Sequence, residues 1–330
     1  MSGQVHNAND DRGQHPPTHH RDRRGFLRQV CAGAVAAAGS HATLRSAQAE
    51  SPAEQPTAGK LPTIKIGKCT VTRLVAGSDP IGGRAHSTQH LAKHMREYFT
   101  QERTTEFARR CEKLGINTWQ TSCSKKALCA LRKLREEGSA LQWICLTYDR
   151  PPQPSLKDIL ALKPIAIVHH GSVTDTMLRL NKHQEVRDFI KKVHDAGVMA
   201  GVSSHSPANI ARIAEEDWGN ELFMTSFYNV GRPDKEIRAK LGTVPVGLPF
   251  FESDRDEMTD VMQKVKQPCL GFKILAAGRL CGNEHMVESA FQYAFKRVKK
   301  TDGVIVGMYP RFTDEVAHDV KLTRQHGQLA

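Results

Sequence analysis

The chain has 330 residues, 25% of them charged, and a formal net charge of +12. This excess of positive charge favours anionic substrates over cationic ones. The basic residues are spread along the chain, as at Arg109-Arg110 and Lys191-Lys192, and no basic strip is interleaved with aromatic residues. We therefore expect a solvated basic surface and no nucleic-acid partner.

The first 49 residues resemble a twin-arginine export signal. Asp22 to Arg28 reads DRRGFLR, a weakly apolar run follows over 30–39, and Ala47-Gln48-Ala49 has the small residues of a cleavage site. The apolar run is too short and too rich in Ala and Gly to remain as a membrane span. The resemblance implies export of the folded protein by the twin-arginine translocase, a periplasmic location and no stable membrane insertion after cleavage.

The rest of the chain divides into a linker and one domain. Residues 50–61, rich in Pro, Ala and Glu, predict a flexible linker. Residues 62–330 form one domain, in which short β-branched apolar runs alternate with stretches of helical period. The predicted strands are 71–76, 117–121, 141–146, 165–168, 198–203, 222–227, 269–274 and 304–306. The predicted helices are 103–114, 125–137, 155–162, 184–196, 207–216, 254–265, 285–298 and 313–324.

Strand–helix units in this order predict an α/β protein with a parallel sheet, because parallel strands need crossover connections. Their number and the domain length suit a closed (β/α)8 TIM barrel. The alternative is an open, doubly wound sheet. That fold would carry a glycine-rich dinucleotide fingerprint after its first strand, and none is present.

Polar and ionisable residues follow the predicted strands. In a TIM barrel these strand ends form the face that carries active sites. Leaving such residues buried and unpaired is costly, which favours a functional role for the set. The candidates for substrate binding are Asp79, His86, His205 and Asn229, and the candidates for catalysis are Gln120, His169, His170, Tyr228 and Lys273.

Lys273 stands out because it lies within the apolar run Gly271–Leu275, which we predict as strand. Its ammonium must reach a carboxylate, a ligand phosphate or a substrate, or else lose its proton. His169, His170 and His205 lie on adjacent predicted strands, so a shared polar centre is expected. These histidines, with Asp79 or His86, are also candidates for a divalent metal site, although no HxH or HExxH spacing supports one.

Five segments carry motifs in a characteristic order. They are Ile64–Gly83, Leu114–Ser122, Gly201–Ser204, Leu275–Leu280, and Gly303–Gly307 followed by Asp314–Val316. Together they resemble the aldo-keto reductase superfamily over most of residues 64–326. The resemblance implies a barrel that transfers hydride between NADP and a carbonyl or alcohol, such as that of a sugar-like small molecule.

The resemblance also implies which residues hold the cofactor. Ser203 and Ser204 correspond to the residues that bind the nicotinamide amide. The residues expected to meet the nucleotide and its phosphates are Gly278, Arg279, Gly307 and Arg311.

The catalytic set of the superfamily, Asp, Tyr, Lys and His, is mostly absent. Gln120 stands at the place of the aspartate, residues 123–134 contain no tyrosine, and Thr147 stands near the place of the lysine. The histidine corresponds to His169 or His170. Tyr148 and Tyr228 are the tyrosines that could replace the missing acid.

Three functions follow from these residues. The first is an exported NADP-linked oxidoreductase, in which His169 or His170 polarises the substrate oxygen. The second is a non-redox isomerase, lyase or hydrolase that uses Lys273 or a histidine-centred site. The third is a barrel that binds a ligand without catalysis.

Two insertions are expected near the active face. Residues 85–100 carry His86, His90 and His94, which would share one face of a helix because they are spaced four apart. The loop 230–253 is long and contains three prolines. Both are candidate lids over the site.

Overall fold

The computed structural model describes residues 59–147 and 154–329. The predicted export signal, most of the predicted linker, and Tyr148 lie outside the described residues. None of the helices in the described part of the chain is long and apolar enough to cross a membrane.

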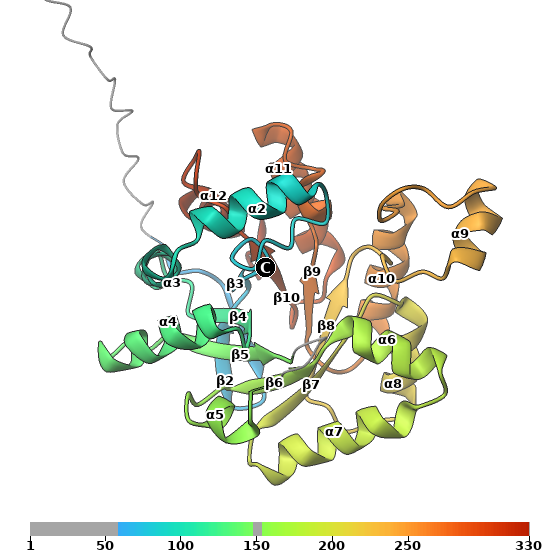
Figure 1. Ribbon diagram of the computed structural model, residues 1–330, viewed down its shortest axis with the longest axis horizontal. Helices are drawn as coiled ribbons and strands as arrows, with labels where there is room; N and C mark the ends of the chain where they lie inside the picture. Colours follow the sequence, from blue (N-terminus) through green and yellow to red (C-terminus); the bar gives the residue numbers. More distant parts are fainter. Residues whose placement is uncertain (1–58, 148–153, 330) are drawn as a thin grey trace, which may run out of the picture. The chain divides into compact units, whose positions relative to one another are not determined.

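Eight parallel strands close into a barrel, which confirms the predicted (β/α)8 TIM barrel (Figure 1). The sheet runs in sequence order and closes where β10 pairs with β3, with Val304 opposite Leu74 and Gly307 opposite Gly77. The barrel strands are β3 (Leu74–Gly77), β4 (Thr118–Ser122), β5 (Gln142–Leu146), β6 (Ala166–His169), β7 (Met199–Ser204), β8 (Leu222–Ser226), β9 (Cys269–Phe272) and β10 (Gly303–Gly307).

Helices follow the strands and surround the barrel (Figure 1). They are α2 (Gln89–Tyr98), α3 (Gln101–Lys113), α4 (Lys125–Glu136), α5 (Leu156–Leu160), α6 (Gly171–Arg179), α7 (His183–Asp195), α8 (Pro207–Glu215), α9 (Asp234–Leu241), α10 (Glu252–Lys264), α11 (Glu284–Arg297) and α12 (Glu315–His326). Several begin at a hydroxyl residue that accepts a backbone N–H of the first turn, as Thr100, Ser124 and Ser206 do. Such caps satisfy backbone donors that have no partner within the helix.

Alternate strand residues build two apolar cores. One set points into the barrel and packs together, and it includes Val75, Ile144, Val168, Met224 and Leu270. The other set points outward and packs against the helices. An antiparallel hairpin, β1 (Thr63–Ile66) and β2 (Cys69–Thr72), adds Ile64, Ile66 and Val71 to the inner core. The hairpin therefore covers the amino-terminal end of the barrel. The carboxyl-terminal end, here called the mouth, is the end where a functional site is expected.

The structure corrects several predicted boundaries. The predicted first strand 71–76 is divided between β2 and β3, and the loop 230–253 contains helix α9. Helix α6 was not predicted. Strand β9 ends at Phe272, so Lys273 follows the strand and has a left-handed backbone with φ +61°. A positive φ for a residue other than glycine ends strand geometry, and periodicity does not reveal it.

The insertion 85–100 also differs from expectation. It does contain a helix, but α2 begins only at Gln89, after the N-cap Thr88. His86 lies before the helix in a left-handed conformation with φ +49°. The predicted histidine face is therefore limited to His90 and His94.

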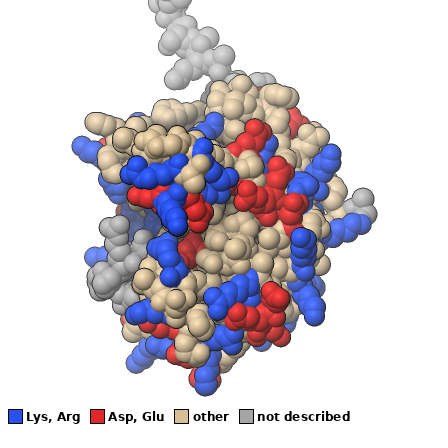
Figure 2. All heavy atoms as spheres, turned by 90° about the vertical axis from the view of Figure 1, so that its right-hand side faces the viewer, with Lys and Arg blue, Asp and Glu red and all other residues tan. Residues whose placement is uncertain are grey.

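Basic and acidic side chains are interspersed on the face seen in Figure 2. Ion pairs between described residues include that of Arg187 with Glu216 and that of Arg297 with Asp260. This face carries no extended basic strip, in line with the interpretation of its charge as a solvated surface.

Candidate functional site

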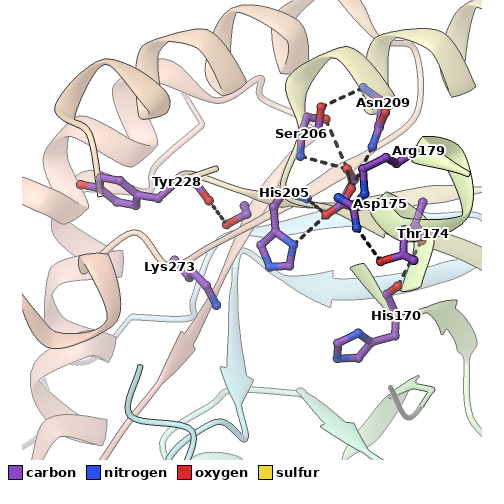
Figure 3. A network of polar contacts seen from close by, with 12 residues as sticks. His170, Thr174, Asp175, Arg179, His205, Ser206, Asn209, Tyr228 and Lys273 are labelled. Atoms are coloured by element: carbon purple, nitrogen blue, oxygen red, sulfur yellow. Dashed lines mark hydrogen bonds and ion pairs between the residues drawn. The ribbon is translucent and has the colours of Figure 1, made fainter. Parts of the chain in front are cut away.

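The alternation of the strands decides which predicted residues reach the mouth. On β6, Ala166 and Val168 point into the barrel, so the next inward position is His170. On β7 the same rule directs Ser203 and His205 inward. Figure 3 shows His170, His205 and Lys273 arranged around one space. The mouth therefore collects polar groups from β6, β7 and the segment after β9.

One contact between ionisable groups there joins Lys273 to the insertion before α2. Lys273 Nζ lies 3.1 Å from His86 Nε2. Asp79, after β3, places Oδ2 4.0 Å from Lys273 Nζ and 3.9 Å from His86 Nε2. The Lys273 side chain is 6% exposed, whereas Asp79 is 47% exposed. One lysine, one histidine and one carboxylate thus form a triangle, with the carboxylate at its solvent side.

This environment disfavours positive charge on two of the three groups. Burial lowers the pKa of Lys273, because an ammonium loses hydration there, and Asp79 opposes this only in part. Burial, followed by the charge of Lys273, lowers the pKa of His86 to about 4. The His86 ring is therefore neutral near pH 7, and the Lys273 amine is shifted toward its neutral, basic form.

The backbone is strained at both members of the Lys273–His86 contact. Both residues are left-handed, as are Ala276 and Ala277 in the turn that follows Lys273. Such conformations cost about 1–3 kcal/mol each and cluster at functional sites. The surrounding structure must therefore stabilise these conformations on both sides of the contact.

Two arginines complete this side of the mouth. Arg84 Nη1 lies 3.3 Å from His170 Nε2, so the guanidinium can donate to the ring. Arg279 donates to the backbone oxygens of His86 and Ala276. The guanidinium of Arg279 also lies 3.9 Å from the centre of the Phe250 ring, in the loop before α10. Arg279 thereby fixes the position of His86.

A second network involves a residue that the sequence analysis missed. Asp175, on α6, places Oδ2 2.9 Å from His205 Nδ1 and accepts the backbone N–H of His205. Its other oxygen accepts Ser204 Oγ and Asn209 Nδ2. Burial alone would raise the pKa of Asp175, but the bonds from His205, Ser204 and Asn209 outweigh it and lower that pKa. Asp175 therefore stays a carboxylate beside His205.

His169 does not join the other histidines. Its ring lies 4.8 Å from the ring of Phe189 on α7, and its Nδ1 lies 2.8 Å from Thr174 Oγ1. The expected centre shared by His169, His170 and His205 is therefore not formed, because neighbouring strand residues point to opposite faces. Only His170 and His205 face the mouth.

We predict that His169 makes stability depend on pH. Burial, followed by the charge of His170, lowers its pKa from 6.5 to about 4. The unfolded chain then binds more protons, so this stability is complete above pH 6.5 and falls by on the order of 3 kcal/mol as the pH passes through 4. As the pH is lowered from 7 to 4.5, the urea midpoint of His169→Gln should fall less than that of the wild type. His90→Gln, at an exposed site, should keep the wild-type slope, and an unchanged slope in both variants would refute the prediction.

The remaining candidates are Gln120 and Tyr228 for catalysis and Asn229 for substrate binding. Gln120 is buried and points inward on β4. The ring of Tyr228 packs against Phe250, 5.1 Å between centres, and points away from the mouth in Figure 3. Asn229 donates its backbone N–H to Asp254. Tyr228 is therefore not placed to act as the acid of the mouth.

The residues expected to hold NADP do not assemble as a set. Ser203 is buried and points into the barrel, but the hydroxyl of its neighbour Ser204 is directed to α6 and bonded to Asp175. Gly278 lies in a tight turn, and the adjacent Arg279 is committed to two carbonyl oxygens and an aromatic ring. The Ser204 hydroxyl is thus engaged with Asp175, and the Arg279 guanidinium is engaged with backbone oxygens.

At the far end of the implied cofactor site, two positions are exposed: Gly307, which ends β10, and Arg311. The insertion helix α2 packs against this segment. His94 Nδ1 lies 3.0 Å from Tyr309 Oη, and Tyr98 donates its hydroxyl to the backbone of Pro310. One predicted lid thus rests on the loop after β10.

The second predicted lid lines an open pocket. The segment 230–249, with α9 and the end of α6, surrounds a volume of about 380 Å³. Its lining combines apolar residues with the charged residues Arg179, Arg232 and Asp234. Gly231 belongs to this lining, and a Cβ at that position would lie 3.4 Å from Asp175 Oδ2.

No group of three or more His, Cys, Asp or Glu side chains among the described residues could hold a metal ion. His86 is instead bound to Lys273, and His205 is bound to Asp175. The described part of the mouth therefore offers no metal centre of the kind considered from the sequence.

Comparison with known proteins supports the fold. No family model matches the chain, and no curated protein matches it in sequence. Among solved structures, an aldo-keto reductase from Bacillus halodurans in its holo form matches 81% of this chain and 95% of its own, at 14% identity and a TM-score of 0.51. A glycerol dehydrogenase from Gluconobacter oxydans matches 80% and 96%, at 12% identity and a TM-score of 0.46.

A barrel named for a different activity matches as well. The dihydropteroate synthase of Xanthomonas albilineans covers 81% of this chain and 96% of its own, at 12% identity and a TM-score of 0.45. The similarity to the Bacillus halodurans structure supports the (β/α)8 barrel fold alone. The function must therefore be argued from the site of this chain.

Proposed function

We propose that this protein is an enzyme that acts on a small molecule bearing a carbonyl or hydroxyl group, with Lys273 as its reacting base. One observation carries the proposal: the Lys273 amine is nearly buried at the mouth, 3.1 Å from the ring of His86. Burial lowers the pKa of Lys273, which makes the amine a base and a nucleophile. The site thus favours the non-redox function among the three that the sequence allows.

Two reactions are open to such an amine. It can take a proton from a carbon next to a substrate carbonyl and return it at a neighbouring atom, as isomerases and lyases do. It can also add to the carbonyl carbon, with loss of water, to form a Schiff base. Arg84, the histidines and Lys273 surround the space, whereas Asp79 is the partly exposed carboxylate, so neutral or anionic substrates are favoured.

Borohydride trapping tests the proposal. The protein is incubated with dihydroxyacetone and sodium borohydride, which reduces an imine to a stable secondary amine. Peptide mapping should find the reduced three-carbon adduct first at Lys273, and Lys273→Ala should abolish it. The variant Lys191→Ala, at a solvent-exposed lysine, should trap normally. Labelling that is equal at surface lysines and at Lys273 would count against the proposal.

The second candidate is the NADP-linked oxidoreductase. The observation that favours it is the exposure of Gly307, which ends β10, and of Arg311 in the loop that follows. A native mass spectrum taken with and without NADPH tests it. A nucleotide adduct would support this candidate, whereas none at saturating NADPH would remove it.

We also propose that the protein is exported by the twin-arginine translocase and works in the periplasm. The support is the segment Asp22–Arg28 with its adjacent arginines. Replacing both Arg23 and Arg24 with lysine should keep the protein in the cytoplasmic fraction of a bacterial host. Unchanged fractionation of the double variant would argue against this route.

A further inference from the structure

The hydrogen-bonded pair of Asp175 and His205 has no role in the function proposed above. Both side chains are nearly buried, 8% and 9% exposed, and they come from different elements, α6 and the end of β7. Figure 3 shows the His205 ring projecting from Asp175 toward the space that His170 and Lys273 also face. The pair thus lies beside the reacting amine of Lys273.

The hydrogen bonds decide which ring nitrogen is available. His205 Nδ1 lies 2.9 Å from Asp175 Oδ2, and a carboxylate can only accept, so Nδ1 carries the proton. Ser204, Asn209 and the backbone of His205 donate to the same carboxylate and keep it in place. In the neutral ring, Nε2 then has a lone pair directed away from Asp175.

Two glycines lie against the Asp175–His205 pair. Gly171 begins α6, and a Cβ there would lie 3.2 Å from His205 Cε1 and 3.0 Å from Ser203 Oγ. Gly231 approaches from the other side, where a Cβ would lie 3.4 Å from Asp175 Oδ2. A side chain at Gly171 would press on His205 and Ser203, whereas a Cβ at Gly231 would make an ordinary van der Waals contact with Asp175. Helix α6 can therefore deliver Asp175, one turn after Gly171, against the histidine.

Phe272 supports the ring from β9. The two ring centres lie 5.6 Å apart with an interplanar angle of 72°, an edge-to-face contact. Phe272 directly precedes Lys273, whose Nζ lies 5.0 Å from the same ring. One aromatic side chain therefore sets the positions of both His205 and Lys273.

We propose that His205 is the second catalytic residue of the mouth and that Asp175 is its positioning residue. The inference rests on the proposed function. The amine of Lys273 takes a proton from the carbon that bears the substrate hydroxyl, and the electrons of that C–H bond form a C=C bond as the neighbouring carbonyl oxygen takes up the negative charge. At the same time His205 Nε2 takes the hydroxyl proton, and the imidazolium, stabilised by the Asp175 carboxylate, gives it to that carbonyl oxygen. The ammonium of Lys273 then returns its proton to the former carbonyl carbon, as the former hydroxyl oxygen becomes the new carbonyl. No proton is gained or lost over the cycle. The substrate class is accordingly a hydroxy-carbonyl compound, with both groups on neighbouring carbons.

Two measurements test this. Nitrogen-15 NMR of histidine-labelled protein at alkaline pH should show His205 protonated at Nδ1, and Asp175→Ala should lose this fixed tautomer. Exchange of the carbon-bound protons of dihydroxyacetone with deuterated solvent should fall by about 100-fold or more in Asp175→Ala and in His205→Gln. His205→Gln keeps the test valid if Asp175→Ala does not fold. Glu288→Ala, which removes the partner of His326 elsewhere, should change neither result.

The outcomes separate this inference from the proposed function. A His205 ring protonated at Nε2, or exchange that survives in His205→Gln, would overturn the inference and leave Lys273 in place. A wild-type protein that neither traps nor exchanges the substrate would overturn the proposed function and this catalytic role with it. The tautomer is read without substrate, so the first result cannot be mistaken for the second.

Discussion

Replacing Lys273 with methionine is expected to lower proton exchange on dihydroxyacetone by about 10²–10⁴-fold, the usual contribution of a positioned acid or base. Methionine is similar in length and apolar, so it suits a side chain that is 6% exposed. The fold should therefore remain, as judged by circular dichroism and the urea midpoint. The rate is followed by NMR as loss of the substrate proton signal.

Lys273→Arg distinguishes a base from an anchoring cation. A guanidinium keeps its charge in proteins and cannot accept a proton at the working pH. If Lys273 acts as a base, the arginine variant should be as inactive as the methionine variant. If Lys273 only attracts an anionic group, arginine should retain much of the rate. An arginine variant with near wild-type exchange would therefore refute the role proposed for the amine.

The fold could be predicted because one pattern, a short apolar strand followed by a helix, recurs along the chain. Short apolar runs such as Leu141–Leu146 and Leu222–Phe227 recur with helices between them, and each run alone already indicates a buried parallel strand. An error in the predicted bounds of one strand does not change the number of strand–helix units. The barrel closure between β10 and β3 then follows from the number of units and not from any single residue.

The site was predictable only in part. Strand ends led to His170, His205 and Lys273, because the fold class itself places them on one face. The contact of Lys273 with His86 could not be predicted, since it joins residues 187 positions apart through left-handed backbone at both ends. No periodic pattern reports such a conformation, so sequence identified the groups but not their pairing.

Asp175 and Arg84 were missed for a different reason. Asp175 lies on α6, a helix of nine residues that begins directly after β6 and is absent from the predicted helices. An available signal was Gly171 followed four positions later by an acidic residue, which places that acid one helical turn above the strand end. Arg84 lies in a loop whose course depends on the packing of α2. Local sequence does not determine either partner.

The mouth therefore holds two groups that can exchange protons, Lys273 and His205, and their surroundings differ. Lys273 and His86 are adjacent bases whose positive charge is disfavoured by burial. His205 has a carboxylate partner that holds its ring through Nδ1 and leaves Nε2 facing the mouth. This division supports reaction at two adjacent substrate atoms.

Asp254→Ala is expected to have the largest effect on stability, a loss of about 3–5 kcal/mol in the free energy of unfolding. Asp254 and Arg232 form a salt bridge 2.7 Å long, with side chains 1% and 3% exposed. Removing the carboxylate leaves a buried guanidinium whose other ionic contact is Glu236, 3.7 Å away and largely exposed. It also frees the backbone N–H of Asn229, so the segment leading to Gly231 and the mouth loses its anchor.

Asp260→Ala is the matched control for Asp254→Ala. It lies on the same helix α10 and removes an ion pair with Arg297 that is 61% and 35% exposed. Pairs of this kind contribute about 0–1 kcal/mol, so its urea midpoint should stay close to that of the wild type. The double variant Arg232→Met/Asp254→Ala should recover part of the loss, because no uncompensated charge remains buried. Equal losses for Asp254→Ala and Asp260→Ala would show that the buried pair does not anchor this side of the mouth.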